Sequence, residues 1–222
     1  EITPLAEACQ KHQIPLHLDC VQAIGKIPFH FHDSGATAVS LAAHKFHGPR
    51  GVGALIVNEG ARLLPQITGG HQERGKRAGT EPVALAAGMA KALATAMQEQ
   101  EVRAKHTAAL RDQLQAGLLT LCAPAVVNGS QEHRLPNTLN ISFPGLDGEA
   151  LLISLDLAGI SCSLGSACAS GSRDPAPVLL AMGCEERVYR SAVRLSLSFL
   201  NTNEEIESAI QRISKVVNQL RS

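Results

Sequence analysis

The chain has 222 residues, 45% of them hydrophobic, enough for a sizeable core in one large domain or two modest ones. Twenty basic and twenty acidic side chains give zero formal charge without a Lys/Arg run, which argues against nucleic acid or an anionic membrane as a partner. No apolar stretch approaches the roughly 18 residues of a membrane span. Six cysteines without any CxxC pair are typical of free thiols in a reducing compartment. We therefore expect a cytoplasmic protein whose ligand is a small molecule.

The first half of the chain has the alternating pattern of an α/β layer. An amphipathic helix is predicted at 2–13, and strands at 14–19, 36–43 and 52–57, each bounded by Gly, Pro or Asp. These apolar runs are typical of buried strands. Apolar residues at helical spacing then cover 82–121, which predicts one long helix or two that bridge two parts of the chain.

The second half predicts a separate α+β domain. Its expected strands are "PNTLNISF" (136–143) and "AVRLSLSF" (192–199), and its expected helices lie at 148–159 and 203–220. We place the boundary between residues 99 and 100, which gives domains 1–99 and 100–222.

Lys45 stands in an unusual setting, "AAHKFHGPRGVG" (42–53), where glycines let the backbone turn sharply and approach a flat ligand. A lysine amine can form a Schiff base with an aldehyde, and pyridoxal 5'-phosphate (PLP) is the common aldehyde cofactor. That cofactor needs a carboxylate at its pyridine nitrogen, for which Asp19 stands at a strand end, and Gln22 could contact the ring hydroxyl. Taken singly, Asp19 is more often a helix cap and Lys45 a solvated loop residue.

Two loops add candidates. "GGHQERGKRAGTEP" (69–82) places glycines, arginines and Thr80 ahead of a helix, as a phosphate-binding loop would; the alternative is a flexible connector. "SCSLGSACASGS" (161–172) carries Cys168 among small polar residues, as a mobile reactive thiol would be; the alternative is an inert surface cysteine. No metal is expected, because the histidines of "FHFHDS" (29–34) lack further ligands at a recognisable spacing.

Five motifs in this order resemble the PLP-dependent cysteine desulfurases of the NifS/IscS-like branch, within the class V aminotransferases: "HLDCVQAIGKIP", "AAHKFHGPRGVGAL", "GGHQERGKRAGT", "PNTLNISF" and "SLGSACASG". The resemblance implies an α/β fold, the PLP-dependent transferase fold type I. Residues 1–99 would be the C-terminal part of the PLP-binding large domain. Residues 100–222 would be the small C-terminal domain with the catalytic cysteine loop.

The resemblance also implies roles at the cofactor. Lys45 would hold PLP covalently, Asp19 would pair with the pyridinium nitrogen, and Gln22 would contact the ring hydroxyl. His44 would lie beside the phosphate and the lysine, with a part in catalysis. Thr80 would reach the phosphate of the neighbouring subunit's cofactor, so a homodimer is expected.

The remaining implied roles concern the substrate. Arg194 would clamp the carboxylate of L-cysteine, and Cys168 would take its sulfur as a persulfide, which leaves L-alanine. The receivers would be acceptors such as an iron-sulfur scaffold protein, or thio-cofactor pathways. The alternatives are a selenocysteine lyase or another cysteine C–S lyase, and a catalytically silent truncated fragment.

Three departures from the family pattern bear on cofactor binding. Ala42 and Ala78 stand where the family commonly has hydroxyl residues, which predicts weaker phosphate binding. The family's N-terminal segment, with a phosphate loop and a ring-stacking histidine, would precede Glu1. We therefore expect the 222 residues alone to leave a sheet half-built, and to be poorly soluble or to bind PLP weakly.

Overall fold

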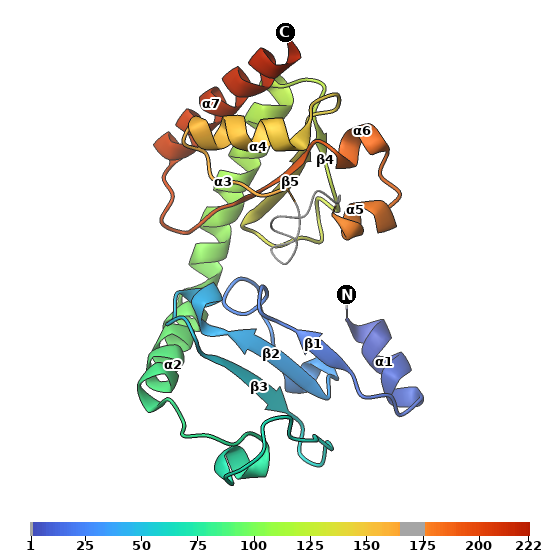
Figure 1. The fold of residues 1–222 in the computed structure, drawn as a ribbon, viewed down its shortest axis with the longest axis vertical. Coiled ribbons are helices and arrows are strands. Elements are labelled where there is room, and N and C mark those ends of the chain that lie inside the picture. The colour runs from blue at the N-terminus through green and yellow to red at the C-terminus, as the bar shows by residue number, and fades with distance from the viewer. Residues whose placement is uncertain (1, 165–175) are drawn as a thin grey trace. The chain divides into compact units, whose positions relative to one another are not determined.

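The computed structural model describes residues 2–164 and 176–222 of the chain. The chain divides into two compact units, Glu1–Glu101 and Val102–Ser222, each of which is described by itself (Figure 1). This division falls two residues after the predicted boundary at 99; the functional labels of the two domains remain predictions.

The first unit is a three-stranded mixed sheet with helices. Strand β1 (His17–Asp19) runs parallel to β2 (Ala38–Ala42), which pairs antiparallel with β3 (Gly53–Val57), in the order β1-β2-β3. The other elements are α1 (Thr3–Lys11), α2 (Val83–Gln98) and the 3₁₀ helices η1 (His32–Ser34), η2 (Ala43–Phe46) and η3 (Gln72–Gly75). All three predicted strands are present, each shorter than its apolar run.

The core of the first unit lies between the central strand and α2. Val39 and Leu41 are buried together with Phe46 of η2 and Ala96 of α2. Leu93, from the same helix, packs against this cluster. The apolar side of α2 therefore packs against β2 and η2, and this packing fixes the position of the residues that follow β2.

The two outer strands are more exposed than the sequence predicts. His17 and Asp19 of β1 are exposed, as are Leu55 (50%) and Ile56 (41%) of β3. The expectation of buried strands is right for β2 and wrong for β1 and β3, because these are the outer strands of the sheet and are covered less than the central strand. The described sheet thus has exposed apolar side chains on its outer strand β3.

Exposed leucine on an edge strand promotes association, so we expect the 222 residues alone to self-associate. Leu55→Ser should raise the apparent dissociation constant about tenfold, since burying a leucine contributes about 1.5 to 3 kcal/mol. Light scattering against concentration measures this. Leu157→Ser is the matched control, because Leu157 is more exposed (84%) but lies at the end of a helix in the other unit. Equal effects of the two substitutions would rule out the sheet as the contact.

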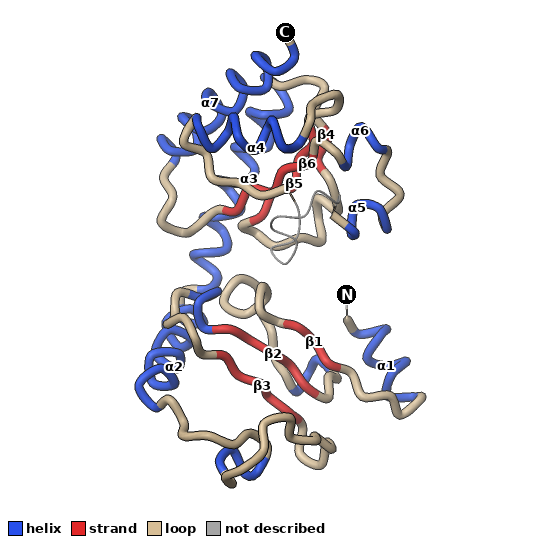
Figure 2. Tube along the Cα trace, in the orientation of Figure 1, coloured by secondary structure: helices blue, strands red, loops and turns tan. Residues whose placement is uncertain are grey.

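The second unit is an antiparallel sheet with helices, as the α+β prediction has it. Strands β4 (Val126–Val127), β5 (Thr138–Ser142) and β6 (Ala192–Ser196), drawn in red in Figure 2, are hydrogen-bonded in the order β4-β5-β6. The helices are α3 (Gln100–Leu121), α4 (Gly148–Leu157), α5 (Pro177–Ala181), α6 (Glu186–Tyr189) and α7 (Asn203–Arg221). The predicted helical stretch 82–121 is thus two helices that separate at Glu99.

The core of the second unit joins α3, α4 and α7 to one face of this sheet. Leu114, Ile141, Leu155, Val193 and Val217 are all almost completely buried in one cluster. Both sequence-predicted helices of this unit begin at side-chain caps. The Asp147 carboxylate accepts from the Ala150 amide at the start of α4, and a Thr202/Glu205 capping box begins α7. None of the helices among the described residues combines the length and the apolar composition of a membrane span.

Candidate active site

Asp19 and Lys45 belong to the same edge of the first sheet. Strands β1 and β2 are parallel, with Asp19 opposite Ser40, so their carboxyl ends meet at one edge. Asp19 is the last residue of β1, and Lys45 lies in η2, which follows β2 directly. This edge, where open α/β sheets bind their ligands, therefore carries one carboxylate and one amine.

The 3₁₀ turn η2 decides which side chains face outward. Its first and last residues, Ala43 and Phe46, are buried, because positions three apart share a face of a 3₁₀ helix. His44 is therefore exposed and Lys45 half-buried. The Gly48 amide donates to the Ala43 carbonyl over 2.9 Å and closes the turn. A Cβ at Gly48 would stand 2.9 Å from Ala43 Cβ, so glycine is required for this tight closure.

A helical turn over residues 20–26 follows Asp19. The Asp19 Oδ1 accepts a hydrogen bond of 3.0 Å from the Val21 amide, so this carboxylate caps the turn as well as standing at the strand end. Gln22 is exposed on the turn, and its side-chain oxygen accepts from Lys26 Nζ over 2.9 Å. Burial, and next the charge of Asp19, raise the pKa of the Cys20 thiol, which makes it a poor nucleophile.

Lys26 interacts with two of the candidate residues, Gln22 and Lys45. Burial, and next the positive charge of Lys45, lower the pKa of Lys26 to about 8. The two lysines thus interact electrostatically. Sequence reasoning did not select Lys26; the signal available was its i,i+4 spacing from Gln22.

The 69–82 loop places Thr80 in the exposed approach to α2. Ala78 is buried, and its amide donates to the Ile67 carbonyl over 3.1 Å, so this position anchors the loop. Ala42, the last residue of β2, carries no hydroxyl that could bind a phosphate. Within the described residues no hydrogen bond joins Thr80 to Asp19, Gln22 or Lys45, so its role stays a prediction.

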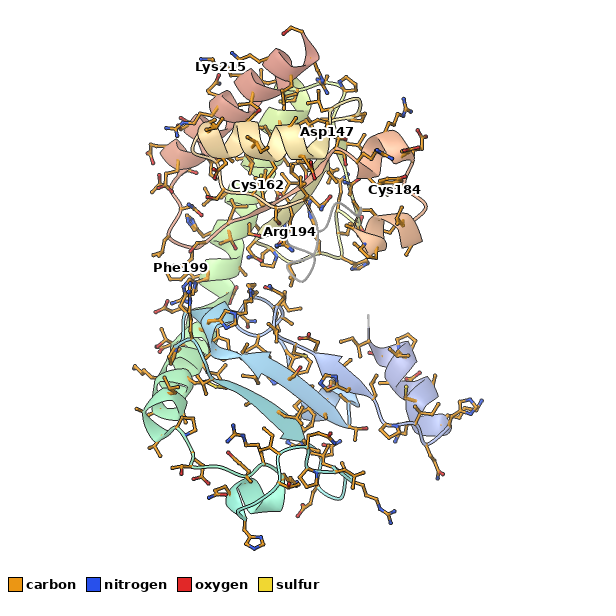
Figure 3. All side chains as sticks on the ribbon, viewed as in Figure 1. Asp147, Cys162, Cys184, Arg194, Phe199 and Lys215 are labelled. Carbon is orange, nitrogen blue, oxygen red and sulfur yellow. The ribbon has the colours of Figure 1, made fainter. Side chains whose placement is uncertain are left out.

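Arg194 lies on β6 of the second unit, opposite Asn140 on one side and Ser163 on the other. Arg194 and Ser163 exchange two backbone hydrogen bonds, of 2.7 and 3.2 Å. Arg194 Nε and Ser163 Oγ are buried, and neither has a hydrogen-bond partner in the described structure. Buried polar groups are normally paired, so these two atoms mark a place where a polar ligand could bind. Figure 3 labels Arg194 on its strand.

The predicted sulfur acceptor, Cys168, lies outside the described residues. Cys162, labelled in Figure 3, packs against the core of the second unit. Burial, and next the charge of Asp156, raise the pKa of Cys162 to about 11. At neutral pH this thiol is protonated and unreactive. Within the described residues, no group of three His, Cys, Asp or Glu side chains could hold a metal ion.

Comparison with known proteins supplies the family. Residues 1–208 match the aminotransferase class-V family. The chain belongs to the class-V aminotransferase family. It is 43% identical over 221 residues to the cysteine desulfurase NifS of Azotobacter vinelandii, a match that covers 100% of this chain and 55% of the relative.

Two solved structures have the fold of this class-V chain. A NifS-like protein matches with a TM-score of 0.86 and 38% identity, over 96% of this chain and 55% of the other. A NifS-like protein from Rickettsia africae matches with a TM-score of 0.89 and 31% identity, over 98% and 57%. These likenesses confirm the predicted PLP fold type I architecture with a partial large domain. The chain spans about half the length of the relatives that it matches.

Proposed function

We propose that the protein to which this chain belongs is a PLP-dependent cysteine desulfurase. It converts L-cysteine to L-alanine and passes the sulfur to an acceptor such as an iron-sulfur scaffold protein. The observation that carries the proposal is the position of Asp19 and Lys45 at the carboxyl ends of two neighbouring parallel strands, within a class-V aminotransferase chain. Relatives named cysteine desulfurase support the same reaction.

The residues at this edge fit PLP by their chemistry. Lys45 offers a half-buried primary amine, Asp19 a carboxylate, and Gln22 an exposed amide, which match the aldehyde, the pyridinium nitrogen and the ring hydroxyl. Bound PLP supplies an electron sink for the carbanion left when the substrate α-carbon loses its proton. The charge of Asp19 favours a protonated pyridine, and Lys45 is the base that removes and returns the proton.

Two further roles are proposed for residues outside the first unit. Arg194 binds the substrate carboxylate through its planar fork, for which its unpartnered Nε is free among the described residues. The Cys168 thiolate accepts the sulfur. The carbon–sulfur bond of cysteine breaks, a sulfur–sulfur bond forms on Cys168, and the β-carbon gains a proton; the carbon is reduced as the sulfur is oxidised. Cysteine and one thiol thus give alanine and one persulfide.

The assembly and location form part of this proposal. A homodimer is proposed because Thr80, exposed ahead of α2, is available to a neighbouring subunit's cofactor. Cys9, Cys20, Cys122, Cys162 and Cys184 are free thiols. Their state is consistent with a reducing cytoplasm.

The proposal is tested by adding PLP and L-cysteine to the protein at its natural length and measuring alanine and protein-bound persulfide. One alanine for each persulfide in the first turnover supports a desulfurase. Free sulfide without persulfide indicates another C–S lyase, and a strong preference for selenocysteine indicates a selenocysteine lyase. No product and no PLP binding would contradict all three activities.

Arg194→Lys should raise the KM for cysteine by roughly 10- to 100-fold, because lysine cannot form the two parallel hydrogen bonds of a guanidinium. PLP affinity should be unchanged. Initial rates against cysteine concentration measure the effect. Arg190→Lys is the matched control, since Arg190 forms an exposed ion pair with Glu186. An unaltered KM in Arg194→Lys would move the carboxylate site to other residues.

A further inference from the structure

The helical turn over residues 20–26 holds Gln22 and Lys26 together. Lys26 Nζ donates to Gln22 Oε1 over 2.9 Å and to the Gln22 carbonyl over 3.2 Å. The turn is closed by the Ile24 and Ile27 amides, which donate to the carbonyls of Cys20 and Ala23. Lys26 thus forms hydrogen bonds with both the side chain and the main chain of Gln22.

The hydrogen bond fixes the orientation of the Gln22 amide. An ammonium group has three donors and no acceptor, so Lys26 can bond only the oxygen of the amide. The Nε2 group, with its two hydrogens, must then point away from Lys26, and it has no partner among the described residues. Gln22 therefore offers its surroundings a hydrogen-bond donor and not an acceptor.

The same turn is packed against the lysine segment. A Cβ added at Gly25 would stand 3.3 Å from the Cβ of Phe46, the neighbour of Lys45, and 3.1 Å from that of Ala96. The turn and η2 are therefore in direct contact through Gly25. Burial, and next the charge of Lys45, lower the pKa of Lys26 to about 8, yet Lys26 stays mainly protonated at neutral pH and remains a donor.

We infer that Lys26 is a positioning residue, which holds the Gln22 amide with its nitrogen toward the ligand so that the site takes an anionic ring oxygen at this point. The inference rests on the proposed function, in which that oxygen is the ring hydroxyl of PLP in its ionised form. Lys26 acts through Gln22 and needs no contact with the cofactor. If Lys26 is removed, the amide is free to rotate and to present its oxygen, which repels an anionic acceptor.

The test is a double-mutant cycle in the protein at its natural length, with PLP as the probe. The variants are Lys26→Met, Gln22→Met and the double variant, with Lys26→Arg as the conservative substitution that keeps the donors. The PLP dissociation constant and the visible absorption bands of the bound cofactor are measured. The ratio of the absorption bands of bound PLP reports the ionisation of its ring hydroxyl. A merely structural role of Lys26 would leave this ratio unchanged.

Lys26→Met is expected to weaken PLP binding about threefold to tenfold, the scale of one ordinary hydrogen bond, and to shift the ratio of the absorption bands. Lys26→Arg should restore both. In the Gln22→Met background, Lys26→Met should have no further effect. Additive losses, or an unshifted band ratio in Lys26→Met, would overturn the inference alone. Failure of the unchanged protein to bind PLP would overturn the proposed function, and the inference with it.

Discussion

Replacing Lys45 by alanine is expected to remove the covalent attachment of PLP and to lower alanine formation by on the order of 10⁴-fold or more, the scale seen when a covalent-catalysis group is deleted. The fold should survive, because η2 is held by the buried Ala43 and Phe46 and closed at Gly48, none of which needs the lysine. Borohydride reduction followed by peptide mass spectrometry measures the attachment, and circular dichroism checks the fold.

Lys26→Ala is the informative control for this experiment, because Lys26 is a second amine that interacts electrostatically with Lys45. At a PLP concentration that saturates its weakened site, this control should keep the borohydride-trapped label on Lys45. A label that persists in Lys45→Ala, or that moves to Lys26, would place the reactive amine elsewhere.

Replacing Cys168 by serine is expected to leave PLP binding intact and to abolish persulfide formation, since a hydroxyl cannot take up sulfur as a persulfide. Alanine release should fall by about 10³-fold or more, the scale of losing a nucleophile. Persulfide is measured by alkylation and mass spectrometry, and alanine by amino-acid analysis.

Cys162→Ser is the matched control for the sulfur acceptor, because Cys162 lies six positions earlier. Its thiol packs against the core, with a pKa raised to about 11, so its replacement should leave sulfur transfer unchanged. Full alanine production by Cys168→Ser would point to a lyase that needs no acceptor thiol. Loss of persulfide in Cys162→Ser would show that Cys162 takes part in sulfur transfer, which our proposal assigns to Cys168 alone.

Much of the fold could be predicted because hydrophobic period and chain-breaking residues are local signals. The central strand β2, the capped helices α4 and α7 and the division into two parts all follow from such patterns. Strand β4 has two residues and α6 four, which are too short to show a period. The exposure of β3 could not be read locally, because burial depends on what packs against a strand and not on its own residues.

The candidate site also has a part that could be predicted from local sequence signals and a part that could not. Asp19 and Lys45 could be assigned to one edge, because Asp19 ends one strand, Lys45 follows the next, and parallel strands end together. The contact between Lys26 and Gln22 depends on the helical turn and on Gly25 at φ +76, which no period reveals. The pairing of Ser163 with Arg194 joins segments far apart in the sequence, so only the folded sheet shows it.

The close approach of Gly25 to Ala96 means that α2 affects the position of the turn that bears Gln22. Ala96 is buried (1%), and its methyl group sets how closely the turn bearing Gln22 can approach the helix. A bulkier residue at position 96 has to push that turn outward, since protein interiors leave no spare volume. Cofactor retention can thus be tuned by selection or by engineering from a position that never faces the ligand, while every ligand-facing residue stays unchanged.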